Sequence, residues 1–522
     1  MPSRTWTSRA LSLSGVMLLA LSPMSALSAH ADTAASPAWT GGAPLPPARS
    51  TTPVLTRDED GEPGMGVAPN GQFWVASDVA PYASDDPRAS NGLLTGADIW
   101  TSTDGGQTYQ WVADPFANGN QSGAAGEDTD LAVAPEKNSA GFYNVYATSL
   151  WLGASSLAWS ADGGKTWTVN QLGGIPAQDR PWLAADGPCT VYLAYHQLPL
   201  FTPTISKYDV CTAGQVPQGM GATLDPVNQT TLTLSTFPGL SNSFNKIAVD
   251  PHSHALYVPG SVCTVQSADD IVTNANASNC PKGTQYVVSV STDGGTTFKD
   301  YPVVNDPSGS TLVWAATVAT DAAGTVYFTW SDSKNSYLNV SHDGGQTWSP
   351  STQLNPAGTS AVYPTVAGGD AGRVDVAWYG TDRAGDSNDA NVMGAPGSAA
   401  GAPWAVYLAR STDGGQTLAT EQVSDTIHRG YLCTHGSGCN SDGSRNLLDD
   451  FGLTISPATS LDSIAYTSDQ PDGSAGHAFT GFTSELGSTP PPAVPESPVP
   501  VLLALIGAAV LAVGLRLRHR RA

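Results

Sequence analysis

Short apolar or alternating runs, bounded by glycine, proline, asparagine or aspartate, recur along most of the chain. Runs of this length and period are typical of β-strands, and no long amphipathic helical stretch accompanies them. Many runs come in pairs that share one pattern, in which a hydrophobic residue and alanine precede a turn and a second run ends near Tyr or Trp. Seven such pairs begin near residues 66, 131, 182, 247, 318, 366 and 453. The pattern predicts an all-β protein built from similar units.

An eight-residue turn pattern, Ser-x-Asp-Gly-Gly-x-Thr-aromatic, follows five of the runs. Its copies lie at residues 102–109, 160–167, 291–298, 341–348 and 411–418, the last ending in leucine. Asp-Gly favours a hairpin because glycine adopts positive φ without a Cβ clash, and the Asp side chain can accept from N–H groups of its own turn. We therefore expect the turn aspartates to be structural and exclude them from any site: Asp104, Asp162, Asp293, Asp343 and Asp413.

The spacing of these turns sets the number of units. One unit takes roughly 60 residues, if the long interval between the second and third turns holds two units, so residues 46–486 hold about seven. This predicts a single seven-bladed β-propeller, with six blades as the alternative. The last unit has no turn octapeptide, and residues 51–56 are expected to supply its outer strand and close the ring.

The octapeptide resembles the Asp-box, or bacterial neuraminidase repeat, and residues 46–486 resemble the sialidase superfamily. Residues 179–182, 363–373 and 429–449 look like a secreted bacterial branch that is called sialidase-like. The resemblance implies a ligand pocket at the propeller axis and Asp-boxes on the opposite face. A fold alone does not give a function, so chemistry has to be argued from the pocket.

Both ends of the chain predict export and anchoring. Residues 1–31 read as a signal peptide with a basic start, an apolar centre and a small-x-small cleavage site. A linker, residues 32–45, precedes the propeller, and a proline-rich stalk follows it at 487–498. Residues 499–515 then predict a transmembrane helix, and the basic tail 516–522 predicts a cytoplasmic end. We expect a membrane-anchored protein with its propeller outside the cell; processing of the C-terminal tail is the alternative.

Net charge limits the classes of binding partner, and the cysteines indicate the compartment. The formal net charge is −23 at pH 7, which disfavours nucleic acid as a partner. Six cysteines fit an oxidising compartment. Pairing between cysteines that are near in sequence predicts the disulfides Cys189–Cys211, Cys263–Cys280 and Cys433–Cys439, although six cysteines allow fifteen connectivities. The spacings do not fit zinc. We expect a monomer.

Residues just before each innermost strand are the candidates for the pocket that the resemblance implies. The candidate catalytic carboxylates are Glu62, Asp130, Asp179 and Asp449. The candidate ligand-binding residues are Arg180, Trp182, Lys246, Trp314, Tyr363, Arg429 and Arg445. Aromatic faces beside carboxylates suit a sugar-binding cleft, and paired carboxylates suit glycoside hydrolysis. The alternative for each carboxylate is a structural role at a strand end.

Two functions remain open. Sialidases of the resembling superfamily bind the substrate carboxylate with three arginines, the first in an Arg-Ile-Pro motif, and here Glu62-Pro63 stands in its place. This departure favours a propeller that binds glycans or other surface ligands, with a glycoside hydrolase that uses a carboxylate pair as the alternative. No cofactor is expected, although residues 58–62 and 128–130 offer oxygen ligands for calcium.

Overall fold

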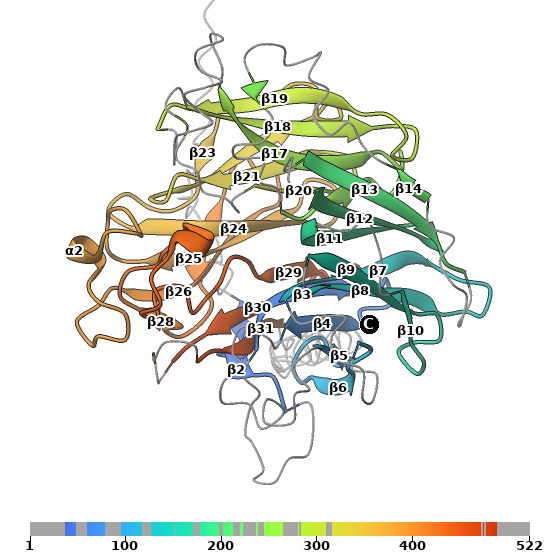
Figure 1. Ribbon diagram of the computed structural model, residues 1–522, viewed down its shortest axis with the longest axis horizontal. Helices are drawn as coiled ribbons and strands as arrows, with labels where there is room; N and C mark the ends of the chain where they lie inside the picture. The colour runs from blue at the N-terminus through green and yellow to red at the C-terminus, as the bar shows by residue number, and fades with distance from the viewer. Residues whose placement is uncertain are drawn as a thin grey trace, which may run out of the picture. The chain divides into compact units, whose positions relative to one another are not determined.

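The computed structural model describes residues 37–47, 60–78, 96–116, 127–151, 153–170, 178–197, 202–211, 220–222, 236–237, 245–264, 280, 283–308, 316–470, 473 and 477–487. These residues form seven antiparallel sheets of four or five strands. Figure 1 shows the sheets following one another around a common centre. The predicted seven-bladed propeller is confirmed, and the six-bladed alternative is wrong.

The first three blades follow the chain without interruption. Blade 1 contains β3 (Gly61–Val67), β4 (Phe73–Asp78), β5 (Ala97–Ser102) and β6 (Gln110–Ala113). Blade 2 contains β7 (Glu127–Lys137), β8 (Tyr143–Trp151), β9 (Ala154–Ser160) and β10 (Thr168–Asn170). Blade 3 contains β11 (Gln178–Asp186), β12 (Thr190–Gln197), β13 (Thr202–Asp209) and β14 (Met220–Ala222).

Of the next three blades, blades 4 and 6 add short extra elements to this plan. Blade 4 contains β15 (Thr236–Phe237), β16 (Ala248–Val249), β17 (Leu256–Thr264), β18 (Thr284–Ser291) and β19 (Lys299–Asp306). Blade 5 contains β20 (Thr317–Thr320), β21 (Val326–Ser331), β22 (Ser336–Ser341) and β23 (Thr352–Gln353). Blade 6 contains β24 (Ser360–Gly368), β25 (Val374–Thr381), β26 (Pro403–Ser411), β27 (Ala419–Gln422) and β28 (His428–Arg429), with helix α2 (Ala390–Met393) between β25 and β26 and the 3₁₀ turn η4 (Gly436–Gly438) after β28.

The seventh blade joins the two ends of the propeller. Its strands β29 (Gly452–Ile455), β30 (Asp462–Ser468) and β31 (Phe479–Leu486) are joined by β1 (Ala38–Trp39) and β2 (Ala43–Pro44), which both pair with β31. The outer edge of this blade is thus formed by residues from the stretch 32–45, for which the sequence predicted a linker. Residues 51–56, which were expected to close the ring, lie outside the described residues.

The innermost strands form a closed ring. Each of β3, β7, β11, β16, β20, β24 and β29 contacts the next one, and β29 contacts β3. Large side chains fill the spaces between neighbouring sheets; Trp74 and Ile99 of blade 1, for example, share one buried cluster with Leu131 and Val145 of blade 2. The core is therefore repeated from blade to blade around the axis.

Each turn octapeptide begins where the third strand of its blade ends. In the first copy, Thr108 donates from its N–H and its hydroxyl to the Asp104 carboxylate, at 3.0 and 2.6 Å, and the Gly106 N–H donates to the Ser102 hydroxyl at 2.9 Å. The same bonds recur in the other copies, for instance around Asp343. The predicted structural role of these aspartates follows from bonds that are made within the turn itself.

Strand direction separates these turns from the start of the innermost strands. Within a blade the neighbouring strands are antiparallel, so the first and third strands run the same way. The start of β3 and the end of β5, where an octapeptide begins, consequently lie at opposite ends of the blade. Side chains at the starts of the innermost strands therefore face the other end of the propeller from the octapeptides.

No helix among the described residues is both long and apolar enough to cross a membrane. The expected signal peptide at residues 1–31 and the expected transmembrane helix at 499–515 lie outside the described residues, and both stay predictions.

Candidate functional site

The innermost strands of four blades begin with the same backbone irregularity. A β-bulge interrupts the register near the start of β3, β7, β11 and β24. At each bulge one non-glycine residue has φ between 37° and 58°: Glu62, Asp128, Arg180 and Tyr363. A left-handed conformation at such a residue costs about 1–3 kcal/mol, and bulges redirect side chains. Its repetition in four blades points to a shared functional requirement at the axis.

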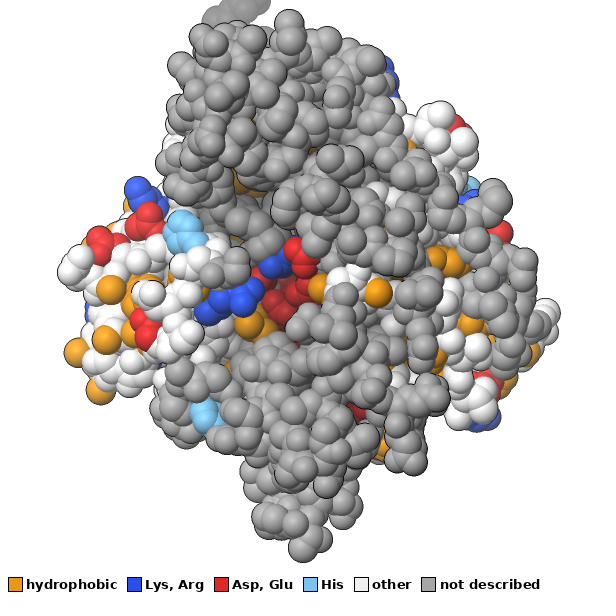
Figure 2. All heavy atoms as spheres, viewed as in Figure 1, with side chains coloured by type: hydrophobic (Ala, Val, Ile, Leu, Met, Phe, Trp, Pro, Cys, Tyr) orange, Lys and Arg blue, Asp and Glu red, His pale blue; other side chains and the backbone are white. Residues whose placement is uncertain are grey.

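The side chains at these bulges converge. Glu62 lies within electrostatic reach of Asp128 and Asp449, and Arg180 lies within reach of all three. Tyr363 lies near the same charges, and its hydroxyl donates to the Cys433 carbonyl at 3.4 Å. Figure 2 shows a hollow near the middle of the face in view, with acidic side chains inside it beside Lys or Arg side chains. We call this group of residues the axial pocket.

Carboxyl groups dominate the axial pocket. They come from three blades and from the segment that precedes β29: Glu62, Asp78, Asp128, Asp130, Asp179, Asp449 and Asp450. All are buried except Asp128 and Asp179, which are half-buried, and the Asp179 side chain is 34% exposed. Asp128 and Asp179 are thus the carboxylates that a ligand can reach.

Three cations offset part of this charge. Nη2 of Arg180 lies 2.8 Å from Oδ2 of Asp449, and Nη2 of Arg445 lies 2.5 Å from the same oxygen. Nζ of Lys246 lies 3.6 Å from Oδ1 of Asp130. Among the described residues the carboxyl groups outnumber the cations, so this part of the pocket is acidic.

Burial and mutual repulsion change the acidity of these groups. Burial, followed by the charges of Asp128 and Asp78, raises the pKa of Glu62 well above its ordinary range. Burial and the charge of Asp128 do the same to the pKa of Asp78. Both shifts favour the protonated form of the acid over the carboxylate.

Asp179 and Asp449 shift in opposite directions. Burial raises the pKa of Asp179 to about 6, against the attraction of Arg180 and with the help of the neighbouring Asp128. Burial alone would also raise the pKa of Asp449, but the guanidinium groups of Arg180 and Arg445 outweigh it and lower that pKa. Carboxyl groups whose pKa values are pushed apart are typical of functional sites.

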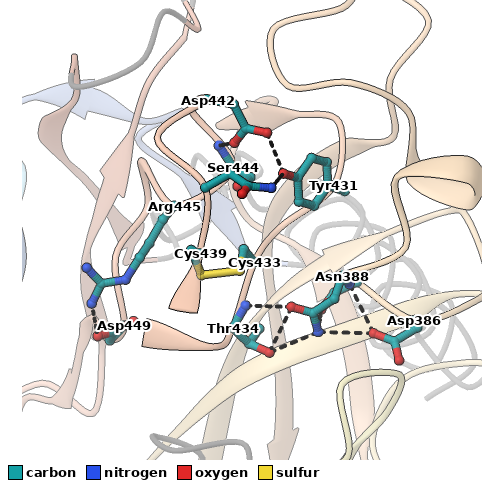
Figure 3. The surroundings of a disulfide bond; sticks show 12 residues. Asp386, Asn388, Tyr431, Cys433, Thr434, Cys439, Asp442, Ser444, Arg445 and Asp449 are labelled. Atoms are coloured by element: carbon teal, nitrogen blue, oxygen red, sulfur yellow. Dashed lines mark hydrogen bonds and ion pairs between the residues drawn. A yellow bond between two sulfur atoms is a disulfide. The ribbon is translucent and has the colours of Figure 1, made fainter. Parts of the chain in front are cut away.

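A loop closed by a disulfide brings Arg445 to the pocket. The bond joins Cys433 to Cys439, and the Cys433 N–H donates to the Ser444 carbonyl at 2.9 Å. At its base, the Thr434 N–H donates to Oδ1 of Asn388 at 2.8 Å. Arg445 follows this loop in the chain, and Figure 3 shows its side chain pointing toward Asp449. The loop therefore fixes the position of one of the two arginines.

A comparison with protein families identifies the repeat. The family profile described as the BNR/Asp-box repeat matches residues 340–350, which contain the fourth turn octapeptide. The chain is a β-propeller that carries an Asp-box repeat. A search of curated proteins found no match.

Solved structures with similar folds include enzymes and a lectin. An α-L-arabinofuranosidase from Fusarium graminearum, solved with an iminosugar inhibitor, is 12% identical over 85% of this chain and 97% of its own, with a TM-score of 0.42. An intramolecular trans-sialidase from Ruminococcus gnavus is 11% identical over 82% and 94%, with a TM-score of 0.35. A lectin from Aleuria aurantia, solved with α-methyl-L-fucoside, is 11% identical over 70% and 94%, with a TM-score of 0.38. At these scores the matches assign no substrate or chemistry to this propeller.

All four candidate catalytic carboxylates lie in the axial pocket, and three of them, Glu62, Asp179 and Asp449, are linked to one another. Oε1 of Glu62 accepts from the Asp449 N–H at 3.2 Å, and Arg180 lies between Asp449 and Asp179, whose Oδ2 is 4.0 Å from Nε. Asp130 instead accepts from the Leu183 N–H at 2.8 Å. This bond ties blade 2 to blade 3 and gives Asp130 a structural role.

The candidate ligand-binding residues divide in the same way. Arg180, Lys246, Tyr363 and Arg445 belong to the axial pocket. Trp182 is 4% exposed and packs with Ala184 and Ile247 between blades, because the bulge in β11 turns Arg180 to the axis and Trp182 to the core. Arg429 lies half-buried in β28, without a side-chain hydrogen bond or ion pair to the described residues. Trp314 lies outside them.

Asp78 is a pocket residue that reasoning from the sequence missed. It ends β4, the second strand of blade 1, whereas candidates were sought only at the starts of innermost strands. The available signal was an aspartate that follows the apolar run 73–76 and Ser77.

The predicted disulfides are present: Cys189–Cys211, Cys263–Cys280 and Cys433–Cys439. Within the described part of the chain, no group of three or more His, Cys, Asp or Glu is placed to hold a metal ion. A calcium ion at residues 58–62 or 128–130 stays a prediction, because residues 58 and 59 are not described.

Proposed function

We propose that the axial pocket binds carbohydrate. The observation that carries the proposal is the set of bulges that turn Glu62, Asp128, Arg180 and Tyr363 to one place at the cost of backbone strain. Sugar hydroxyls both donate and accept hydrogen bonds, so they match a pocket in which carboxylates and guanidinium groups alternate. The groups within reach of a ligand are Asp128 and Asp179 as acceptors and Arg445, 31% exposed, as a donor.

Hydrolysis of the bound glycan is the second candidate, and the acidity of Asp179 favours it. With a pKa of about 6, Asp179 holds a proton in mildly acidic solution beside the second carboxylate, Asp128. In a hydrolytic step that proton would pass to the glycosidic oxygen as its bond to the anomeric carbon breaks. Water would add to the anomeric carbon and give its own proton to a more distant carboxylate of the pocket, because Asp128 is hydrogen-bonded to Asp179 and leaves no room for water between the two.

Binding and hydrolysis are separated by one experiment on a glycan panel. Calorimetry would measure binding by the purified protein, and mass spectrometry would detect released sugars. Asp179→Asn is expected to abolish release but leave measurable binding, whereas Asp186→Asn, at the other end of β11 and paired with His254, should change neither. No binding to any glycan by the folded protein would refute the proposal; binding without release would refute hydrolysis.

We also propose that the propeller is displayed outside the cell on the membrane anchor expected at residues 499–515. Three disulfides within the described residues support an oxidising compartment. Protease treatment of intact cells should remove the propeller, and recovery of the uncleaved protein from the cytoplasm would contradict display.

A further inference from the structure

Both arginines that reach the axial pocket bind the same atom of this chain. Arg180 comes from β11 in blade 3, and Arg445 lies between the disulfide-closed loop 433–439 and β29. Their Nη2 atoms lie 2.8 and 2.5 Å from Oδ2 of Asp449. Two guanidinium groups from distant parts of the sequence thus meet on a single carboxylate.

This arrangement resembles an anion-binding site in which a side chain of the protein, the Asp449 carboxylate, takes the place of a bound anion. Guanidinium groups that converge from separate elements are how proteins hold the carboxylate of a ligand. Here the Asp449 side chain is 1% exposed and the Arg180 side chain 8% exposed, so water competes little for the pair. A ligand carboxylate would have to displace Asp449 from both guanidinium groups and leave that buried carboxylate without its partners.

The remaining charges of the pocket also oppose the binding of an anionic ligand. Glu62, Asp128 and Asp450 all lie within electrostatic reach of this arginine pair or of Asp449. Lys246 is paired with Asp130 and leaves this excess unbalanced. An anionic ligand therefore meets repulsion from the half-buried carboxylates before it reaches an arginine.

We propose that Asp449 is a specificity-determining residue, which occupies the arginine pair as an internal carboxylate and restricts the pocket to neutral ligands. The implied substrate class is a neutral sugar, in contrast to sialic or uronic acids; this part rests on the proposed carbohydrate binding. The occupied arginine pair itself is independent of any sugar.

Acetate is the probe for the arginine pair. Asp449→Ala leaves room for a small carboxylate between the two guanidinium groups, whereas Asp449→Asn removes the charge but fills the space. We expect acetate to bind Asp449→Ala and to raise its melting temperature, with an affinity roughly tenfold to a hundredfold above that of the wild type or of Asp449→Asn. Chloride at equal ionic strength is the control for general salt effects. Equal responses of the three proteins to acetate would overturn the proposal.

A second arm uses wild-type protein only, so it does not depend on the folding of a variant. Matched pairs of neutral and acidic sugars, such as galactose and galacturonic acid, are titrated by calorimetry. Binding of the neutral sugar alone supports the inference, and equal or tighter binding of the acidic one refutes it. If the wild type binds neither sugar while acetate binds only Asp449→Ala, then the carbohydrate proposal fails and the role of Asp449 stands.

Discussion

Replacing Asp179 by asparagine should stabilise the propeller at neutral pH. The pKa of Asp179 is raised from 3.8 to about 6 in the folded chain. The protonated group therefore adds stability that is complete below about pH 3.8 and is lost as the pH rises through 6. The asparagine side chain carries no titrating proton and would keep that stability, so the advantage of the variant over the wild type should grow across this window.

The size of the effect follows from the shift and the exposure. A shift of about two units corresponds to about 3 kcal/mol in a group shielded from water. Because the Asp179 side chain is 34% exposed, solvent screening reduces this, and we expect a gain of about 1–2 kcal/mol between pH 4 and 7.5.

Urea unfolding of both proteins, followed by tryptophan fluorescence across this pH range, gives the difference in unfolding free energy. Asp382→Asn, at an exposed carboxylate, corrects for the loss of any carboxylate. A difference that stays flat with pH, or that favours the wild type more as the pH rises, would refute the argument that burial beside Asp128 raises this pKa.

Three further predictions concern the pocket and the ring. Gly64→Ala would place a Cβ 2.6 Å from Asp130 Cα, and should lower the unfolding free energy by about 1–3 kcal/mol. Gly438→Ala is the control, because the nearest atom to its new Cβ lies at 3.6 Å. Equal melting temperatures of the two variants would contradict the close approach of β3 to β7. Glu62→Gln should cost less than about 1 kcal/mol, because burial and the neighbouring carboxylates raise the pKa of Glu62 and favour its uncharged form. Glu62→Ala loses the acceptor of the Asp449 N–H and should cost about 1–3 kcal/mol; equal losses in urea unfolding would contradict this difference. Arg410 binds Asp462 at 2.6 Å and Glu485 at 2.7 Å across blades 6 and 7. Arg410→Met should therefore cost about 3–5 kcal/mol, and a loss below about 1 kcal/mol in the same assay would mean that this network is not needed to hold the two blades together.

The blade architecture could be predicted from sequence because its signals are local. A turn octapeptide needs its own Asp, Gly and Thr at fixed offsets, and each copy reports one blade without reference to the others. The same locality makes a structural role for the turn aspartates predictable from sequence, because the bonds of Asp104 are all made within four residues.

The pocket was only partly predictable because its geometry depends on bulges. Strict alternation along β11 would place Arg180 and Trp182 on one face, but the bulge between Asp179 and Trp182 sends them to different surroundings. Asp78 could not be assigned to the pocket from sequence, because the pairing of β3 with β4 brings it close to Glu62. The spacing of the two residues in the sequence does not predict this pairing. The pairing of Arg180 with Asp449, 269 positions apart, is likewise a property of the closed ring.

The composite seventh blade has a consequence for synthesis of the protein. Its edge residues at 38–44 emerge from the ribosome first, but their partner β31 ends at Leu486 and emerges after all other blades. Until then the ring is a row of sheets with both flanks open, and the early segment has no strand to pair with. The ring can therefore close only after the last strand is complete. A chain that ends before Phe479 would contain the strands of most blades but could not close the ring, and its unpaired strand edges would favour aggregation or degradation.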